Sequence, residues 1–166
     1  MSDKAKKIFL SICIFVPFLI YCIFYYSQML KDAPFRFVDF ESVVLKYGNG
    51  DDLVNQYDSS TGQYQYLNKQ DSLIKTTLRL NKDDLHYIHS KAAELGFWNL
   101  PEEMLSDDTL AAKTSPHFYL QFNYKTKSKS LLLDVDYNEN EKMLSVAKSV
   151  IGEVQRVLND VEDRGK

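Results

Sequence analysis

An uncharged apolar run near the N-terminus constrains this chain more than any other feature of its sequence. From Ile8 to Tyr26 no residue carries a charge, and Ile, Phe, Leu, Val and Tyr dominate. On a helix this run rises about 28 Å, close to the hydrocarbon thickness of a bilayer. Pro17 lies in its middle, where a spanning helix tolerates a kink. The run therefore predicts a single-pass transmembrane helix over residues 8–26, with the lipid bilayer as its partner.

The charges that flank this run favour one orientation in the membrane. Three lysines precede it within residues 4–7, and Lys31 and Arg36 follow it. The positive-inside tendency then places the N-terminus in the cytoplasm and the C-terminal part in the periplasm or outside the cell. Two alternatives remain open. A cleaved signal peptide would need a site with small residues, which is lacking after Tyr26, and a lipoprotein signal would need a small residue just before Cys13.

The remaining length suffices for one domain, so the sequence divides into four parts. These are a short basic tail over 1–7, the transmembrane helix over 8–26, a connector over 27–34 and an extracytoplasmic domain over 35–166. From Lys31 onward there are 17 Lys and Arg against 22 Asp and Glu, a net charge of −5. This balance lacks the basic face of a nucleic-acid binder. Cys13 and Cys22 both lie in the apolar run, so the domain contains no disulfide.

Alternating and helical patterns predict the elements of the domain. Period-two alternation and turn residues indicate six strands, over 35–47, 53–57, 63–67, 73–80, 118–124 and 131–137. Asn81 and Gly96 are suitable caps for a helix between them, followed by Trp98 as a core anchor, and residues 102–116 read as an irregular loop. A long amphipathic helix begins near Asn138. The fold class is therefore α+β, with a mainly antiparallel sheet and two helices packed on one of its faces. Lys75, Arg79 and Asp134 are expected on the other face.

The last helix repeats its apolar residues at alternating steps of four and three, which also fits a coiled-coil seam. Its apolar face is wider than such a seam, and this width favours packing on the sheet of the same chain over dimerisation.

No constellation in the sequence carries catalytic or metal chemistry. His86 and His89 have a spacing that suits two metal ligands, but no third ligand accompanies them, and their place beside the apolar stripe favours boundary positions. The acidic pairs at 51–52, 107–108 and 134/136 lack the pattern of a calcium loop. No cofactor, no metal and no catalytic residue is expected. A hydrolase that uses His86, His89 or His117 with the scattered aspartates would require those groups to converge in one pocket.

Three tyrosines are the candidate partner-binding residues. Tyr57, Tyr64 and Tyr66 lie on neighbouring predicted strands and would form an aromatic patch for a glycan or a protein partner. The alternative, which the pattern favours, is that they fill core positions or cross-strand pairs.

The segment from Leu80 to Pro101 contains the run "DLHYIHSKAAELGFWNLP" and follows polar hairpins. It resembles a pattern of small membrane-anchored bacterial envelope proteins that have no assigned activity. The resemblance implies a location in the cell envelope and no activity or site residue.

These observations predict a non-enzymatic binding or accessory domain that recognises a protein or an envelope component. An immunity or inhibitor protein is an alternative, because an acidic surface can cap a basic active site.

Overall fold

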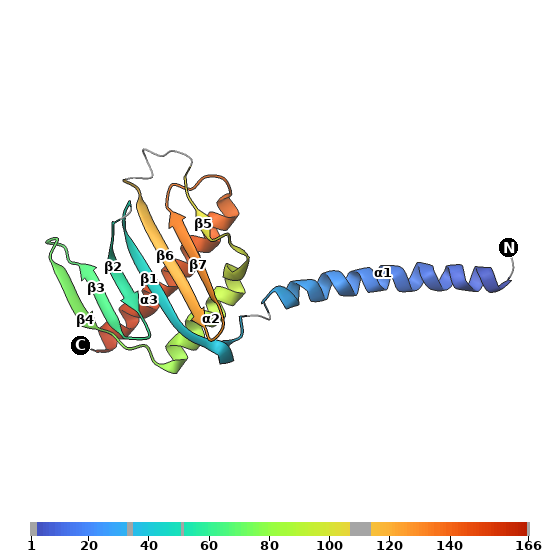
Figure 1. The fold of residues 1–166 in the computed structure, drawn as a ribbon, viewed down its shortest axis with the longest axis horizontal. Coiled ribbons are helices and arrows are strands. Elements are labelled where there is room, and N and C mark those ends of the chain that lie inside the picture. Colours follow the sequence, from blue (N-terminus) through green and yellow to red (C-terminus); the bar gives the residue numbers. More distant parts are fainter. Residues whose placement is uncertain (1–2, 33–34, 51, 107–113, 166) are drawn as a thin grey trace. The chain divides into compact units, whose positions relative to one another are not determined.

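The computed structural model describes residues 3–32, 35–50, 52–106 and 114–165, in two compact units, Met1–Arg36 and Phe37–Lys166 (Figure 1). Asp51, Asp107 and Asp108, which belong to the acidic pairs noted above, lie outside the described residues.

The first unit corrects the prediction of a transmembrane helix over residues 8–26. It consists of helix α1 (Asp3–Asp32), which has Pro17 inside it and continues into the predicted connector. Within the described part of the chain, no helix has both the length and the apolar character that a membrane crossing requires. The bilayer as a partner and the extracytoplasmic location depended on that span, and both stay untested.

The second unit contains a sheet of seven strands in the order β4-β3-β2-β1-β6-β7-β5. The strands are β1 (Phe40–Asn49), β2 (Asp52–Asp58), β3 (Gln63–Leu67), β4 (Leu73–Thr77), β5 (Glu103–Met104), β6 (Pro116–Tyr124) and β7 (Ser128–Asp134). All neighbours are antiparallel except β5 and β7, which are parallel. The sheet is therefore mixed, and the α+β class is confirmed.

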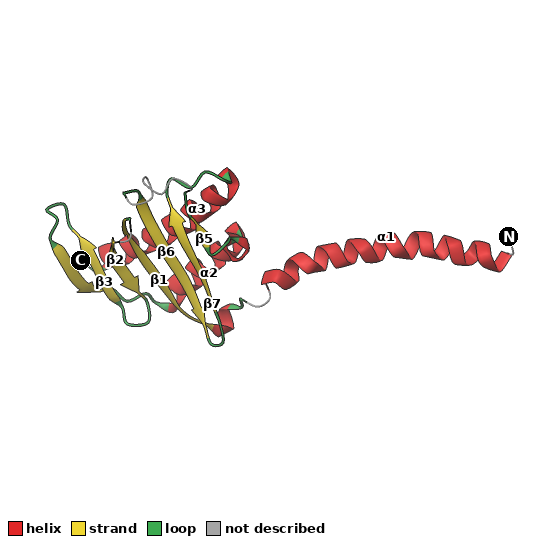
Figure 2. Cartoon of the chain, turned by 45° about the horizontal axis from the view of Figure 1, so that its top comes forward, coloured by secondary structure: helices red, strands yellow, loops and turns green. Residues whose placement is uncertain are grey.

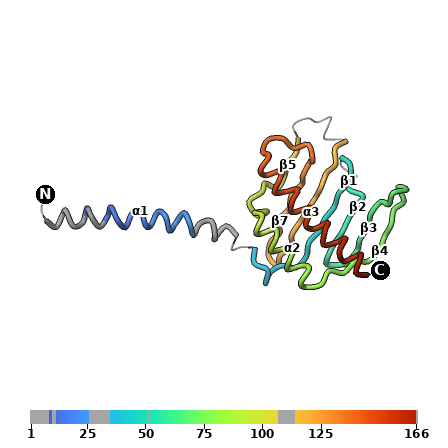
Figure 3. Tube along the Cα trace, turned by 180° about the vertical axis from the view of Figure 1, so that it is seen from behind, coloured from blue at the N-terminus to red at the C-terminus, as the bar shows by residue number. Residues whose placement is uncertain are grey.

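Two long helices cover one face of this sheet, α2 (Lys82–Leu95) and α3 (Glu141–Arg164), as Figures 2 and 3 show from two sides. Two short 3-10 helices, Phe37–Asp39 and Phe97–Asn99, precede β1 and follow α2. The buried residues of α3 all belong to the predicted apolar stripe; they are Ala147, Val150, Ile151, Val154, Val157 and Leu158. The helix thus packs on the sheet of its own chain, as predicted.

The core lies between the sheet and the helices. Val43, Leu45, Leu120, Phe122, Leu131 and Leu133 point from the three central strands toward the helices and are fully buried. Trp98 is buried as predicted, and its ring meets that of Phe122 edge-on at a centroid distance of 5.1 Å. Burial of each large side chain contributes roughly 1.5–3 kcal/mol of transfer free energy, so this layer fixes which face of the sheet is covered.

Local signals in the sequence fix the ends of α2. The Asn81 side chain accepts a hydrogen bond from the Asp84 amide at 2.8 Å, and the Asp84 carboxylate accepts one from the Asn81 amide at 3.0 Å. Gly96 ends the helix at φ 84°, in the left-handed region that glycine adopts without strain. Both predicted caps are confirmed.

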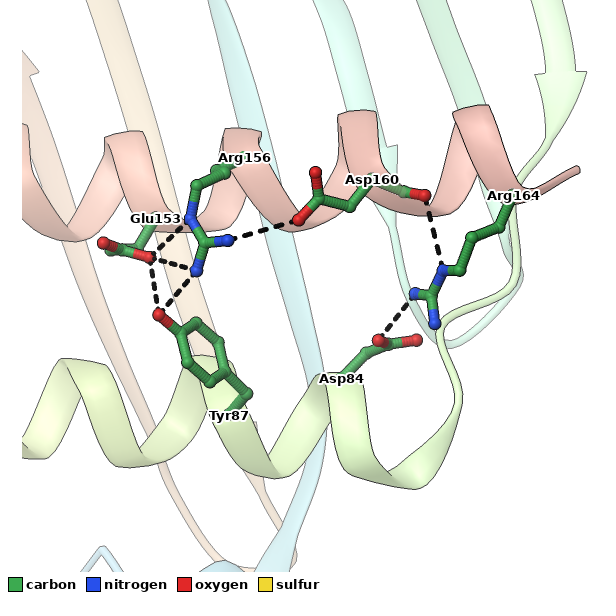
Figure 4. Close-up of polar contacts among 6 residues, drawn as sticks. All are labelled: Asp84, Tyr87, Glu153, Arg156, Asp160 and Arg164. Carbon is green, nitrogen blue, oxygen red and sulfur yellow. Dashed lines mark hydrogen bonds and ion pairs between the residues drawn. The ribbon is translucent and has the colours of Figure 1, made fainter.

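A polar network joins the outer sides of α2 and α3 (Figure 4). Arg156 contacts the Tyr87 hydroxyl at 2.5 Å, Glu153 at 2.9 Å and Asp160 at 3.2 Å. Arg164 pairs with Asp84 at 2.7 Å. The pKa of Glu153 is held below its usual value by its hydrogen bonds with Arg156 and Tyr87. These contacts join the two helices. They also pair three acidic side chains, Asp84, Glu153 and Asp160, with arginines of the same chain, whereas the inhibitor alternative depends on acidic groups that can contact a partner.

The sheet departs from the predicted pattern in two places. β5 lies within the segment that we predicted as an irregular loop, because two residues are too few to show a period. β4 ends at Thr77 and not at Leu80. The amide of Leu78 still donates to the Gly62 carbonyl at 2.7 Å, and the chain then turns toward α2.

Candidate binding surface on the open face of the sheet

The face of the sheet opposite α2 and α3 carries aligned polar side chains, and we call it the open face. Side chains alternate along a strand, so the neighbours of the buried residues Leu45, Tyr57 and Leu120 point to this side. The residues that define the open face are Lys46, Gln56, Gln65, Lys75, Tyr119 and Gln121.

The strand register places five of these side chains in one row. Each residue pairs directly with the next across β4, β3, β2, β1 and β6, in the order Lys75, Gln65, Gln56, Lys46 and Tyr119. A second row, two residues along each strand, consists of Thr77, Gln63, Asp58, Val44 and Gln121. Neighbouring strands are about 4.8 Å apart, so each row extends roughly 19 Å.

A shallow hollow of about 630 Å³ lies over these two rows, open to solvent. Nine of its lining residues carry polar or charged side chains, Lys46, Gln56, Asp58, Gln63, Gln65, Lys75, Thr76, Thr77 and Gln121, and Val44, Tyr57 and Tyr64 complete the lining. Such a surface offers donors and acceptors over a broad area and lacks the enclosed apolar pocket of a small-molecule site.

Hydrogen bonds within the sheet orient the amides of the open face. The Gln65 side-chain amide donates to the Val54 carbonyl at 2.8 Å, and that of Gln56 donates to the Leu53 carbonyl at 2.9 Å. An amide group has two N–H donors and one carbonyl acceptor, so each glutamine keeps capacity for a further partner. The Tyr119 hydroxyl donates to Gln121 at 2.8 Å. The polar groups are thus held in place before a partner arrives.

The charges of the open face favour an acidic partner. Lys46 lies 5.9 Å from the centre of the Tyr119 ring, and Lys75 is exposed. Asp58, the acidic residue of the two rows, accepts hydrogen bonds from the Ser60 amide at 2.8 Å and the Ser60 hydroxyl at 2.6 Å. The balance in the rows is therefore two cations to one carboxylate, in a chain whose formal net charge is −3.

Asp134 does not lie on the exposed surface, which corrects its predicted place. Its side chain is completely buried, and it accepts hydrogen bonds from the Ser115 hydroxyl at 2.7 Å and the Asp136 amide at 2.9 Å. Burial alone would raise the pKa of Asp134, but these hydrogen bonds and a weaker one from the Ser106 amide at 3.4 Å hold the pKa below its usual value.

His117 completes this buried cluster. Its Nε2 atom lies 3.6 Å from the Asp134 carboxylate, and its Nδ1 atom lies 2.7 Å from the Gly50 carbonyl. The Ser115 hydroxyl donates its hydrogen bond to the Asp134 carboxylate, so the aspartate is the common neighbour of the serine and the histidine. The cluster connects the ends of β6 and β7 to the β1–β2 turn, and we interpret it as a buried polar cluster that stabilises the fold.

The three histidines do not converge in one pocket, because His117 lies far from His86 and His89. His89 is buried, with Phe37 and Phe40 each at a ring-centroid distance of 5.5 Å, whereas His86 is exposed. His117 pairs with Gly48, eight residues further along β1 than Phe40, a distance of about 26 Å. The described residues contain no group of three or more His, Cys, Asp or Glu side chains suited to a metal.

The candidate tyrosines lie on the helix side of the sheet. Tyr57 and Tyr64 are buried, with exposed fractions of 1% and 8%, and Tyr66 is half-buried. The Tyr57 hydroxyl donates to the Leu78 carbonyl at 3.2 Å, and burial raises the pKa of both Tyr57 and Tyr64 above the usual range. These placements argue against the exposed aromatic patch and fit cross-strand packing. A binding role for the three tyrosines stays a prediction.

Sequence reasoning did not single out Lys46, Gln56, Gln65, Tyr119 or Gln121. The alternation of each strand already contained the signal that these residues point away from the core. Their alignment into rows depends on the register between strands, which a single sequence does not show.

No protein-family model matches this sequence, and a search among curated proteins found no match. The resemblance of the 80–101 segment to envelope proteins therefore stays a prediction.

Proposed function

We propose that residues 37–166 form a non-enzymatic binding module that recognises a protein partner through the open face of its sheet. The observation that carries this proposal is the pair of polar rows, which cross five strands in register on the face opposite α2 and α3. A sheet face exposed to water needs polar residues, but it does not need them preoriented around a hollow. The partner surface is polar and acidic, complementary to Lys46 and Lys75.

Extent and shape support a protein as the partner. The surface is broad and shallow, and its amides can pair with backbone or side-chain groups of another protein. The half-buried Tyr119 ring adds an aromatic contact of the kind that is enriched at interfaces. The fully buried layer beneath keeps the strands fixed, so binding costs little ordering of the backbone.

Site-specific photo-crosslinking in cells tests this function. A photoreactive amino acid replaces Gln56, which is exposed on the open face, in the full-length chain. The matched control places the same group at Ser149, which is exposed on α3. We expect a discrete adduct from position 56 that position 149 does not give, and we expect Lys46→Glu to abolish it. Equal adducts from both positions, or an adduct that Lys46→Glu leaves intact, would contradict the proposal.

A further inference from the structure

A second surface of this domain, the outer side of β4, is built to pair with another strand. β4 is the last strand of the sheet, and β3 is its partner on the other side (Figure 1). Among the described residues no strand pairs with its outer side. Leu73 is 45% exposed, and Lys75, Thr76 and Thr77 are exposed as well. The backbone of this strand is therefore accessible from solvent along its length.

The hydrogen bonds at both ends of the β3–β4 pair show which backbone groups point outward. The Leu78 amide donates to the Gly62 carbonyl at 2.7 Å, and the Asn68 amide donates to the Ser72 carbonyl at 3.0 Å. Hydrogen-bonded pairs alternate with non-bonded pairs in an antiparallel ladder. By this alternation Thr76 and Ile74 bond to β3. The N–H and C=O groups of Leu73, Lys75 and Thr77 point away from it, and we call these three residues the free edge.

The charge around the free edge is basic. Lys75 lies in the middle of β4, Lys69 precedes the strand and Arg79 follows it, against one acidic residue, Asp71. None of these four residues takes part in the ion pairs observed between described residues. An acidic strand would gain both backbone hydrogen bonds and charge complementarity at this edge.

A second copy of this chain fits the free edge poorly. Antiparallel pairing of two β4 strands over their full length would place Lys75 directly opposite Lys75. Like charges in directly opposed positions destabilise a strand pair. A lysine on an edge strand is also a common defence against such self-pairing.

We propose that the free edge accepts an extended acidic peptide segment of a partner as an eighth strand, with a carboxylate of that segment beside Lys75. This inference goes beyond the proposed function: it uses the outward backbone groups of β4, and it shares with the open face the side chain of Lys75. Backbone bonds at Leu73, Lys75 and Thr77 supply the affinity, and the lysine selects acidic over basic sequences.

The test uses the full-length chain and a capped heptapeptide of alternating threonine and glutamate. Two control peptides have the same length: one carries lysine in place of glutamate, and the other is N-methylated at alternate residues, which removes its donors. Affinity is measured by titration, and amide hydrogen exchange locates the bound strand. We expect exchange of the Leu73, Lys75 and Thr77 amides to slow on binding, while those of Ile74 and Thr76 change little.

Three variants separate the contributions. Lys75→Pro removes an N–H that points away from β3, so the ladder with β3 persists and peptide affinity falls about tenfold. Lys75→Glu folds without any backbone change, and it should reverse the preference from the glutamate to the lysine peptide. Lys46→Glu, on the open face, should leave peptide affinity unchanged.

Equal binding of the N-methylated peptide, unchanged exchange at the free edge, or an unchanged preference in Lys75→Glu would overturn the inference. Failure of this test leaves the crosslinking result at position 56 unaffected, so the two proposals can fail separately.

Discussion

At the scale of a residue, Asp134 is buried although its position in β7 predicts a side chain exposed on the open face. The alternation of β7 points its side chain to the open face, yet Asp134 is completely buried and accepts hydrogen bonds from Ser106 and Ser115. A buried carboxylate that accepts several hydrogen bonds is stable as an anion, and its donors depend on that charge. Removal of the carboxylate would leave the Ser115 hydroxyl and the His117 ring without their common neighbour.

Asp134→Ala should therefore destabilise the domain by about 2–4 kcal/mol, because several buried polar groups lose their partner. Asp136→Ala is the matched control, since Asp136 is exposed and contributes its backbone amide to the cluster. The free energy of unfolding from urea titration distinguishes the two variants. A loss of less than about 1 kcal/mol in the free energy of unfolding of Asp134→Ala would show that the cluster does not stabilise the fold.

The same residue predicts a dependence of stability on pH. The pKa of Asp134 is lower in the folded state than the usual value of about 3.9 in an unfolded chain. Its contribution to stability is then fully present above that value and is lost as the pH falls below it, through the folded-state pKa. Asp134→Asn should flatten this acid-side decline in urea titrations below about pH 4, whereas Asp136→Asn should leave it unchanged.

At the scale of elements, the β1–β2 hairpin requires a glycine at position 48, whereas helix α3 has room for a side chain at Gly152. A Cβ atom on Gly48 would lie 1.9 Å from the Asp52 carbonyl oxygen, at a point where the register of the hairpin shifts. On Gly152, in α3, a Cβ atom would meet nothing within 4 Å. The close approach of two backbone segments therefore requires glycine at position 48 and not at position 152.

Gly48→Ala should destabilise the domain by about 1–3 kcal/mol, because backbone atoms must move to remove the overlap. Gly152→Ala should stabilise it by roughly 0.5–1 kcal/mol, since alanine has the higher helix propensity. Thermal unfolding of both variants under one set of conditions measures the difference. A Gly48→Ala variant as stable as the native chain would mean that the hairpin does not need this close approach.

At the scale of the whole molecule, one face of the sheet supplies stability and the other supplies contact groups. The buried layer of β1, β6 and β7 lies under α2 and α3, whereas Lys46 and Gln121 lie on the open face. Residues that serve binding alone can be exchanged without loss of the fold.

The double variant Lys46→Glu with Gln121→Ala should keep the free energy of unfolding within about 0.5 kcal/mol of the native value while it abolishes crosslinking at position 56. Urea titration and the crosslinking assay, on the same preparation, check both halves of this expectation. A large loss of stability would show that these side chains belong to the structural framework of the sheet.

Short-range signals in the sequence, such as helix caps and strand alternation, determined most of the helices and strands. The Asn81 cap, the left-handed Gly96 and the alternation of β6 act over a few residues, so they predicted α2 and the central hairpin closely. They also predicted the α+β class, because the buried stripe of each helix matches the apolar face of the sheet. The apolar run over 8–26 predicted a membrane span that the described part of α1 does not support.

Contacts between distant segments decided the rest. The register of five strands aligns Lys75 with Tyr119, and no single strand contains that information. The burial of Asp134 depends on Ser115, 19 residues earlier in the chain. β1 pairs with β2 on one side and with β6 on the other, so the later strands β6 and β7 extend the sheet beyond β1. This leaves β4 as the last strand at the opposite edge. The sequence by itself therefore determined which residues form helices and strands and which face of each is apolar. Only the tertiary structure decided which polar side chains meet and which strand lies at the edge of the sheet, because register and strand order depend on long-range pairing.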